Sequence, residues 1–210
     1  MSYAVKEVFK TLQGEGALTG RAAVFCRFSG CNLWSGRESD RSNAVCTFCD
    51  TDFVGTDGHL GSRFSDAEEL ATVIARVWGD DIRGRFVVLT GGEPLLQVDD
   101  DLIAALHQRR FMIAVETNGT IRPPSGLDWV CVSPKARAPL VVKEGDELKL
   151  VYPQDGLSPD SLQDLSFRHF WLQPMDGADR IANTRAAVAY CLQHPRWRLS
   201  LQTHKLIGIP

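Results

Sequence analysis

The alternation of short apolar runs with helical stretches constrains the fold of this 210-residue chain more than any other feature. Apolar runs that predict strands lie at residues 22–30, 85–94, 111–119, 127–135, 147–152, 169–175 and 197–203. Between them lie stretches with helical spacing: one that opens on a capping box at Ser65–Glu68, and others at 99–110, near 158–165 and at 179–193. Continuous apolar strands that alternate with helices indicate parallel strands buried on both faces. We therefore predict an α/β fold, an incomplete TIM-type barrel made of a curved, mostly parallel sheet with outer helices.

The bulk properties of the chain predict a single cytoplasmic domain. No internal repeat or low-complexity linker divides the sequence, so we expect residues 1–210 to fold as one unit. A net charge of −3 and a pI near 5.9 disfavour binding to nucleic acid. The N-terminal stretch lacks the basic and apolar regions of a signal peptide, and no apolar run is long enough to span a membrane.

Three cysteines, Cys31, Cys46 and Cys49, lie near one another without a fourth cysteine close by in sequence. Three thiolates on a four-iron cluster leave one iron open to bind another ligand, whereas a closed structural site normally has four protein ligands. Phe48, between the last two cysteines, adds an aromatic side chain to this segment, the cluster loop at about 31–49. The pattern favours a cluster that takes part in chemistry.

A structural zinc site is the alternative interpretation of these cysteines. Cys-x2-Cys is common in zinc sites, and His59 would then supply the fourth ligand. The remaining cysteines lie in apolar strand-like or helical stretches and are expected to be small buried side chains; they are Cys26, Cys131 and Cys191.

Polar side chains recur at the ends of four successive predicted strands. Active sites of α/β barrels form at the carboxyl ends of the strands, where the loops converge. We therefore expect a ligand site at this edge of the sheet, formed by Thr90, Glu93, Glu116, Asn118, Ser133, Lys135, Gln173 and Asp176.

Arg27 is the one charged residue inside the apolar run at 22–30. A guanidinium group is costly to bury without an anionic partner. The partner is either an internal carboxylate, for which Glu15 and Glu116 are candidates, or a carboxylate on a bound ligand, which the guanidinium fork would hold bidentately.

Taken together, these motifs resemble the radical S-adenosylmethionine enzymes, and within them the 7-carboxy-7-deazaguanine synthase family. The resemblance rests on segments spread from residue 9 to the end of the chain: FKTLQGEG (9–16), CRFSGCNLW (26–34), CDTDF (49–53), TGGEPLLQ (90–97), ETNG (116–119), SPK (133–135) and QTHKLIGIP (202–210). The cysteine spacing departs from the usual C-x3-C-x2-C, since it is C-x14-C-x2-C here. An enlarged cluster loop occurs in some members of this family.

The resemblance implies a carbon–nitrogen lyase of queuosine and 7-deazapurine biosynthesis. It would convert 6-carboxy-5,6,7,8-tetrahydropterin to 7-carboxy-7-deazaguanine by ring contraction with loss of ammonia. A flavodoxin-like donor would supply the electron that cleaves S-adenosylmethionine to a 5′-deoxyadenosyl radical, and this radical, not a protein side chain, would perform the chemistry.

The resemblance also assigns residues to each bound group. Cys31, Cys46 and Cys49 would hold a 4Fe-4S cluster. The residues implied for S-adenosyl-L-methionine are Phe48, Cys49, Asp50, Gly91, Gly92, Glu93, Glu116, Asn118, Ser133, Lys135, Gln173 and Asp176. Those implied for the pterin are Leu12, Gln13, Gly14, Glu15, Arg27, Thr90, His204 and Pro210.

Elementary chemistry leaves several of these roles open. The Thr51 hydroxyl suits a partly hydrated Mg²⁺, and it equally suits a helix cap. Gly14 and Gly16 would let the backbone approach a flat ligand, or they form an ordinary glycine loop. The tail at about 203–210 would fold over the mouth of the site, although fraying is the usual behaviour of a chain end.

Two other functions fit parts of the sequence. One is an activase that installs a glycyl radical in a partner protein, and the other is a zinc-stapled interaction domain without enzyme activity. A homodimer is plausible, because an incomplete barrel has an open edge to cover.

Overall fold

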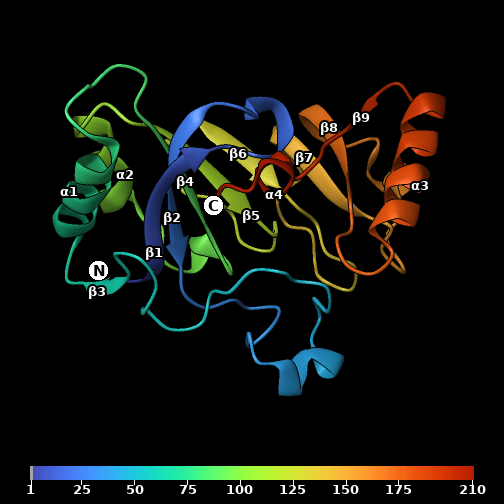
Figure 1. The fold of residues 1–210 in the computed structure, drawn as a ribbon, viewed down its shortest axis with the longest axis horizontal. Coiled ribbons are helices and arrows are strands. Elements are labelled where there is room, and N and C mark those ends of the chain that lie inside the picture. Colours follow the sequence, from blue (N-terminus) through green and yellow to red (C-terminus); the bar gives the residue numbers. More distant parts are fainter. Residues whose placement is uncertain (1) are drawn as a thin grey trace.

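The computed structural model describes residues 2–210, which are built around a nine-stranded sheet (Figure 1). The strand order is β3-β1-β2-β4-β5-β6-β7-β8-β9. The strands are β1 (Tyr3–Leu12), β2 (Ala22–Phe28), β3 (Ser62–Phe64), β4 (Phe86–Gly91), β5 (Met112–Thr117), β6 (Trp129–Val132), β7 (Glu144–Tyr152), β8 (Ser166–Pro174) and β9 (Trp197–Leu199). From β2 through β9, with β3 excepted, neighbouring strands pair in parallel. The predicted open, mostly parallel sheet is confirmed.

Four α-helices accompany the sheet: α1 (Ala67–Trp78), α2 (Asp100–Gln108), α3 (Arg180–Gln193) and α4 (Thr203–Ile207). Figure 1 shows α1 and α2 at one end of the sheet and α3 at the other. Leu70 of α1 and Leu102 of α2 are buried in one core with Leu89 of β4, and Ala187 of α3 lies in a second core with Leu172 of β8. None of these helices of residues 2–210 is long and apolar enough to cross a membrane.

Helix α1 begins one residue later than the sequence predicts. Asp66 is its N-cap, and the Asp66 carboxylate accepts the Glu69 backbone N–H at 2.9 Å. The Glu69 carboxylate in turn accepts the Ser65 N–H at 2.7 Å. The capping pair is thus Asp66 and Glu69, because Glu69, and not Glu68, occupies the third helical position.

Strand alternation places the polar residues on the face opposite α1 and α2. In β4, Val87 and Leu89 join the helix-side core, whereas Phe86 and Val88 pack in a separate cluster on the other face. Thr90 follows Val88 on that face, because side chains alternate along a strand. The parallel register sets Arg27 beside Thr90, and the next strands set Glu116 beside Cys131.

Four further elements differ from the prediction. Strands β1 and β3 were not predicted, and they pair antiparallel at one edge of the sheet. The expected helix near 158–165 is only a 3₁₀ turn at Pro159–Leu162, because β8 begins soon afterwards at Ser166. The expected strand at 197–203 ends at Leu199, and α4 begins at Thr203.

Candidate active site

A cavity of about 420 Å³ lies at the carboxyl ends of the parallel strands, on the face without α1 and α2. It is lined by every residue that the sequence predicts for the site, with the exception of Glu93. These residues are Leu12, Gln13, Gly14, Glu15, Arg27, Cys31, Cys46, Phe48, Cys49, Asp50, Thr51, Thr90, Gly91, Gly92, Glu116, Asn118, Ser133, Lys135, Gln173, Asp176, His204 and Pro210.

The three cysteines of the cluster loop all line this cavity, and all three are free thiols. Burial raises the pKa of Cys31 and of Cys46, and the Lys135 ammonium partly offsets this shift at Cys46. Binding to iron would deprotonate these thiols, and soft thiolates are the ligands that iron–sulfur clusters use. The donor set therefore fits a cluster.

His59, the fourth ligand in the zinc interpretation, lies elsewhere. Its side chain is exposed and does not line the cavity, and its backbone carbonyl accepts the Val8 N–H at 2.8 Å. Among residues 2–210, no three His, Cys, Asp or Glu side chains gather around a position for a single metal ion.

Glu93 is fully buried behind the cavity wall and ties two strand ends together. Its carboxylate accepts the Thr117 hydroxyl at 2.8 Å, the Asn118 N–H at 2.8 Å and the Leu95 N–H at 3.0 Å. Burial raises the pKa of Glu93 despite these three donors. Its side chain therefore holds the loops after β4 and β5 in place and does not face a ligand.

The glycines before Glu93 allow the cluster loop to pack closely. A Cβ atom at Gly92 would lie 2.2 Å from the Gly30 carbonyl oxygen and 2.8 Å from the Cys31 Cβ. Only glycine fits there, so the end of β4 can lie directly against the segment that carries Cys31.

A buried ammonium group, Lys149 of β7, organises two of the carboxylates that line the cavity. Lys149 is paired with Glu15, and its Nζ lies 3.6 Å from Glu116 Oε1. Burial lowers the pKa of Lys149, but the carboxylates of Glu116 and Glu15 outweigh burial and raise it well above its ordinary value. Burial likewise raises the pKa of Glu15, and the Lys149 charge outweighs it, so that Glu15 stays ionised.

Amide side chains fix the orientation of the same carboxylates. Glu15 Oε1 accepts from Gln173 Nε2 at 3.0 Å and from Gln202 Nε2 at 3.0 Å. Glu116 Oε1 accepts from Gln13 Nε2 at 3.0 Å. The network therefore presents oriented acceptors to the cavity.

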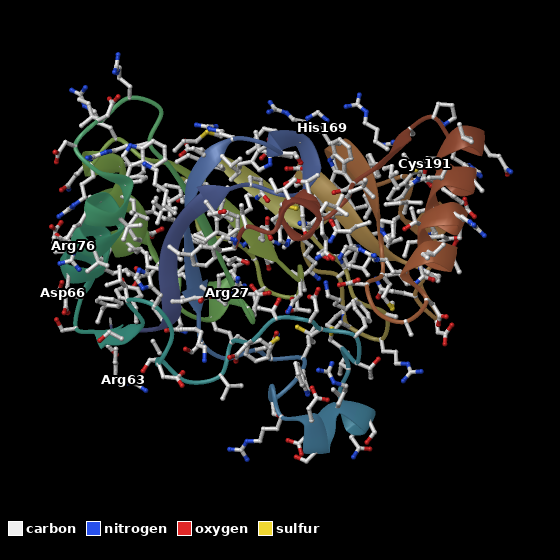
Figure 2. All side chains as sticks on the ribbon, in the orientation of Figure 1. Arg27, Arg63, Asp66, Arg76, His169 and Cys191 are labelled. Atoms are coloured by element: carbon white, nitrogen blue, oxygen red, sulfur yellow. The ribbon has the colours of Figure 1, made fainter. Side chains whose placement is uncertain are left out.

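Arg27 has an internal partner, and it is neither of the two predicted. Its Nε donates to Glu7 Oε1 at 2.7 Å, from the neighbouring strand β1. Both side chains line the cavity, and Figure 2 shows Arg27 near the centre of the molecule. Within residues 2–210 this bond uses only Nε, so the two terminal nitrogens of the fork remain for a ligand.

Lys135 stands near the cluster loop. Its Nζ donates to the Ser133 carbonyl at 2.6 Å and to the Ser133 hydroxyl at 2.7 Å, and it lies 5.9 Å from the centre of the Phe48 ring. Burial lowers the pKa of Lys135. A cation is thus held beside the cysteines, and no carboxylate of residues 2–210 forms an ion pair with it.

The tail is ordered and closes one side of the cavity. The Thr203 N–H and hydroxyl donate to the Gly14 carbonyl at 3.0 and 2.9 Å. Lys205 Nζ lies 2.5 Å from Asp50 and 2.7 Å from Asp176. The space that Gly14 leaves is filled by His204, because a Cβ there would lie 2.1 Å from His204 Nδ1.

Sequence reasoning missed Glu7, Lys149 and Lys205 among the residues lining the cavity. Lys149 carries the same signal as Arg27, a charged residue in an apolar strand, and could have been found that way. Glu7 could not be found without strand β1. Lys205 lies in a five-residue helix that is too short to show a periodic pattern.

Comparisons with known proteins give one consistent result. A 7-carboxy-7-deazaguanine synthase from Bordetella pertussis is 65% identical over 210 residues, and one from Caulobacter vibrioides is 65% identical over 210 residues; each alignment covers 100% of both chains. The crystal structure of QueE from Escherichia coli matches with a TM-score of 0.72 and 29% identity, over 96% of this chain and 94% of that one. No family model matches the chain.

Proposed function

The chain belongs to the 7-carboxy-7-deazaguanine synthase family, and on that premise we propose that it converts 6-carboxy-5,6,7,8-tetrahydropterin to 7-carboxy-7-deazaguanine. It is a radical S-adenosylmethionine enzyme that acts on a small molecule. One observation supports this most strongly: a single cavity is lined by three free cysteines and also by Arg27 and an oriented carboxylate network.

Cys31, Cys46 and Cys49 would hold a 4Fe-4S cluster. When bound, the cluster and S-adenosyl-L-methionine supply the one-electron radical chemistry of the reaction. Lys135 would balance the negative charge of the thiolates, because its ammonium already acts on Cys46. The residues we assign to S-adenosyl-L-methionine are Phe48, Cys49, Asp50, Gly91, Gly92, Glu116, Asn118, Ser133, Lys135, Gln173 and Asp176, with Glu93 supporting them from behind.

Arg27 and the carboxylate network of the cavity suit a carboxylated heterocycle that carries N–H donors. The terminal nitrogens of Arg27 would bind the substrate carboxylate in a fork. Thr51 offers its hydroxyl to a Mg²⁺ ion. Oriented acceptors would meet the N–H groups of the ring, and the residues we assign to the pterin are Leu12, Gln13, Gly14, Glu15, Arg27, Thr90, His204 and Pro210.

Lys149 supports this role through Glu15. Because it keeps Glu15 ionised, Glu15 accepts hydrogen bonds and does not donate one. The Gln173 and Gln202 amides then hold that carboxylate in one orientation. The tail helps to exclude water from the ring, since its backbone is bonded to Gly14.

The protein would act as a homodimer of single-domain chains and take its electron from a flavodoxin-like donor. Helix α3 supports a dimer, because its outer face exposes Ile181, Val188 and Leu192 to 67%, 37% and 79%. Val188 and Leu192 follow Ile181 by seven and eleven residues, so the three side chains lie on one side of the helix.

The test is a reaction with anaerobically prepared protein. We expect a brown protein that, with dithionite or reduced flavodoxin, S-adenosylmethionine and Mg²⁺, forms 7-carboxy-7-deazaguanine from 6-carboxytetrahydropterin, detected by mass spectrometry. A protein that binds iron and cleaves S-adenosylmethionine but yields no deazapurine refutes the proposed substrate.

Arg27→Ala tests the residue that we assign to the substrate carboxylate. We expect it to keep the cluster colour and to raise KM for the pterin by about tenfold or more, since breaking a desolvated charge pair costs about 2–5 kcal/mol. An unchanged KM would mean that Arg27 serves only its pair with Glu7.

A further inference from the structure

The interval between Cys31 and Cys46 is a folded substructure and not a loose loop. It holds a 3₁₀ helix at Glu38–Asn43. Its two ends meet where the Leu33 carbonyl accepts the Val45 N–H at 3.1 Å and the Cys46 N–H at 3.3 Å. The insertion therefore leaves the body and returns to it beside Cys31, and Figure 1 shows it as the light-blue segment projecting below the sheet.

Arg41 connects this insertion to the cysteines. One terminal nitrogen of its guanidinium, NH1, donates to the carbonyls of Thr47 and Cys49, each at 3.0 Å. Nε and the other terminal nitrogen bind the Glu38 carboxylate at 2.7 and 2.5 Å. The guanidinium carbon, Cζ, also lies 4.0 Å from the centre of the Trp34 ring. Every nitrogen of the group is engaged, so its position is fixed.

These contacts place a permanent positive charge against the Cys-x2-Cys segment. Carbonyl oxygens on both sides of Phe48 point to the guanidinium, so they cannot rotate without breaking a charge-assisted hydrogen bond. The charge also lies within electrostatic range of Cys46 and Cys49. A cation near an iron–sulfur cluster stabilises its reduced form, since net charge and hydrogen bonding tune the potential.

We propose that Arg41 is a positioning residue that fixes the conformation of the cysteine segment and raises the reduction potential of the cluster that the segment holds. This inference rests on the proposed 4Fe-4S site. It assigns the insertion a role: the insertion brings an arginine against the backbone carbonyls of Thr47 and Cys49, in the segment that carries the last two cluster ligands.

The test compares Arg41→Met and Arg41→Lys with the parent chain. In Arg41→Met we expect a more negative midpoint potential in an EPR-monitored titration, with the ratio of reduced to oxidised cluster at a fixed potential falling about tenfold, or about 59 mV for a one-electron couple. Arg41→Lys keeps the charge and should retain most of the potential. In iron-free protein, both variants should be cleaved faster by protease within the insertion.

Arg37→Met is the matched control. It removes a positive charge from the same insertion, but the Arg37 side chain is exposed, and only its backbone carbonyl contacts Trp34. We expect its potential and its protease resistance to match the parent. Loss of the cluster from Arg41→Met alone also supports the proposal.

The proposal is overturned if Arg41→Met keeps the parent's potential and the parent's resistance to protease. If the parent itself takes up no iron, the proposed function fails. The protease comparison in iron-free protein still decides whether Arg41 holds the cysteine segment.

Discussion

Charged residues inside apolar strands were the most informative single positions in this chain. Arg27 and Lys149 both interrupt apolar runs, and both line the cavity. The sequence could not reveal their partners, because Glu7 and Glu15 lie on β1 and the loop after it, and pairing across strands depends on register. For Arg27, residue type therefore predicted that a partner exists, and tertiary structure decided which one.

Lys149→Met should reverse the pH dependence that Glu15 gives to stability. In the parent, the pKa of Glu15 is held below its ordinary value of 4.5, so Glu15 adds stability above that pH, and this is lost as pH falls through the folded pKa. Without the ammonium, burial raises the pKa of Glu15. Its contribution is then present at acid pH and is lost as pH rises through the folded pKa. Urea unfolding between about pH 4 and 7 measures how the free energy of unfolding changes with pH.

The double variant Lys149→Met/Glu15→Gln isolates this effect. The other charged groups near this pair, which are His204 beside Glu15 and Glu116 beside Lys149, remain in both variants. We expect the single variant to lose stability with rising pH relative to the double variant. If the free energy of unfolding changes with pH in the same way in both variants, the pKa of Glu15 does not depend on Lys149.

At the scale of elements, continuous apolar strands and capped helices were predictable. Strand β1, which mixes charged and apolar residues, and the very short elements β3 and α4 were not. Strands β4 and β5 and helix α2 lie within the predicted ranges, since each carries its pattern in its own residues. Helix α4 and strand β3 have five and three residues, too few for a period to be read. Such elements exist because of the contacts they make, among them the bonds from Thr203 to Gly14.

Helix α4 should therefore loosen when its ion pairs are removed. Lys205 joins Asp50 and Asp176 in partly exposed pairs, each worth about 0.2–1 kcal/mol. Lys205→Met should speed amide exchange in the tail by roughly fivefold, while the amides of α1 and α2 keep their rates. Hydrogen exchange with mass spectrometry measures both regions.

Lys143→Met provides the comparison, because Lys143 is exposed and lies far along the chain from the tail. It should leave tail exchange unchanged. Equal exchange in Lys205→Met and the parent would show that the backbone bonds to Gly14 alone hold α4.

At the scale of the whole molecule, the parallel sheet explains why the site could be placed from sequence. Carboxyl ends of parallel strands share one edge, so polar residues after β4, β5, β6 and β8 meet there. Glu93 is the exception in this set, since it faces the protein interior and not the cavity. Glu93 follows its strand just as the other polar residues follow theirs, so only the packing of its side chain distinguishes it from them.

The apolar outer face of α3 predicts association of two copies. Ile181→Glu/Leu192→Glu should shift the protein from dimer to monomer in light scattering at micromolar concentration, because two charges would be buried at the interface. Ile82→Glu makes the same change at an exposed position after α1 and should leave the mass unchanged. A parent chain that scatters as a monomer refutes the dimer.

The bond between Gly14 and Thr203 joins positions 189 residues apart. A ribosome must therefore deliver nearly the entire polypeptide before the pocket wall can be finished. A nascent fragment that ends before this point would contain the strands and the thiols but could not close the cavity. The chain can therefore bind its ligands only late in synthesis.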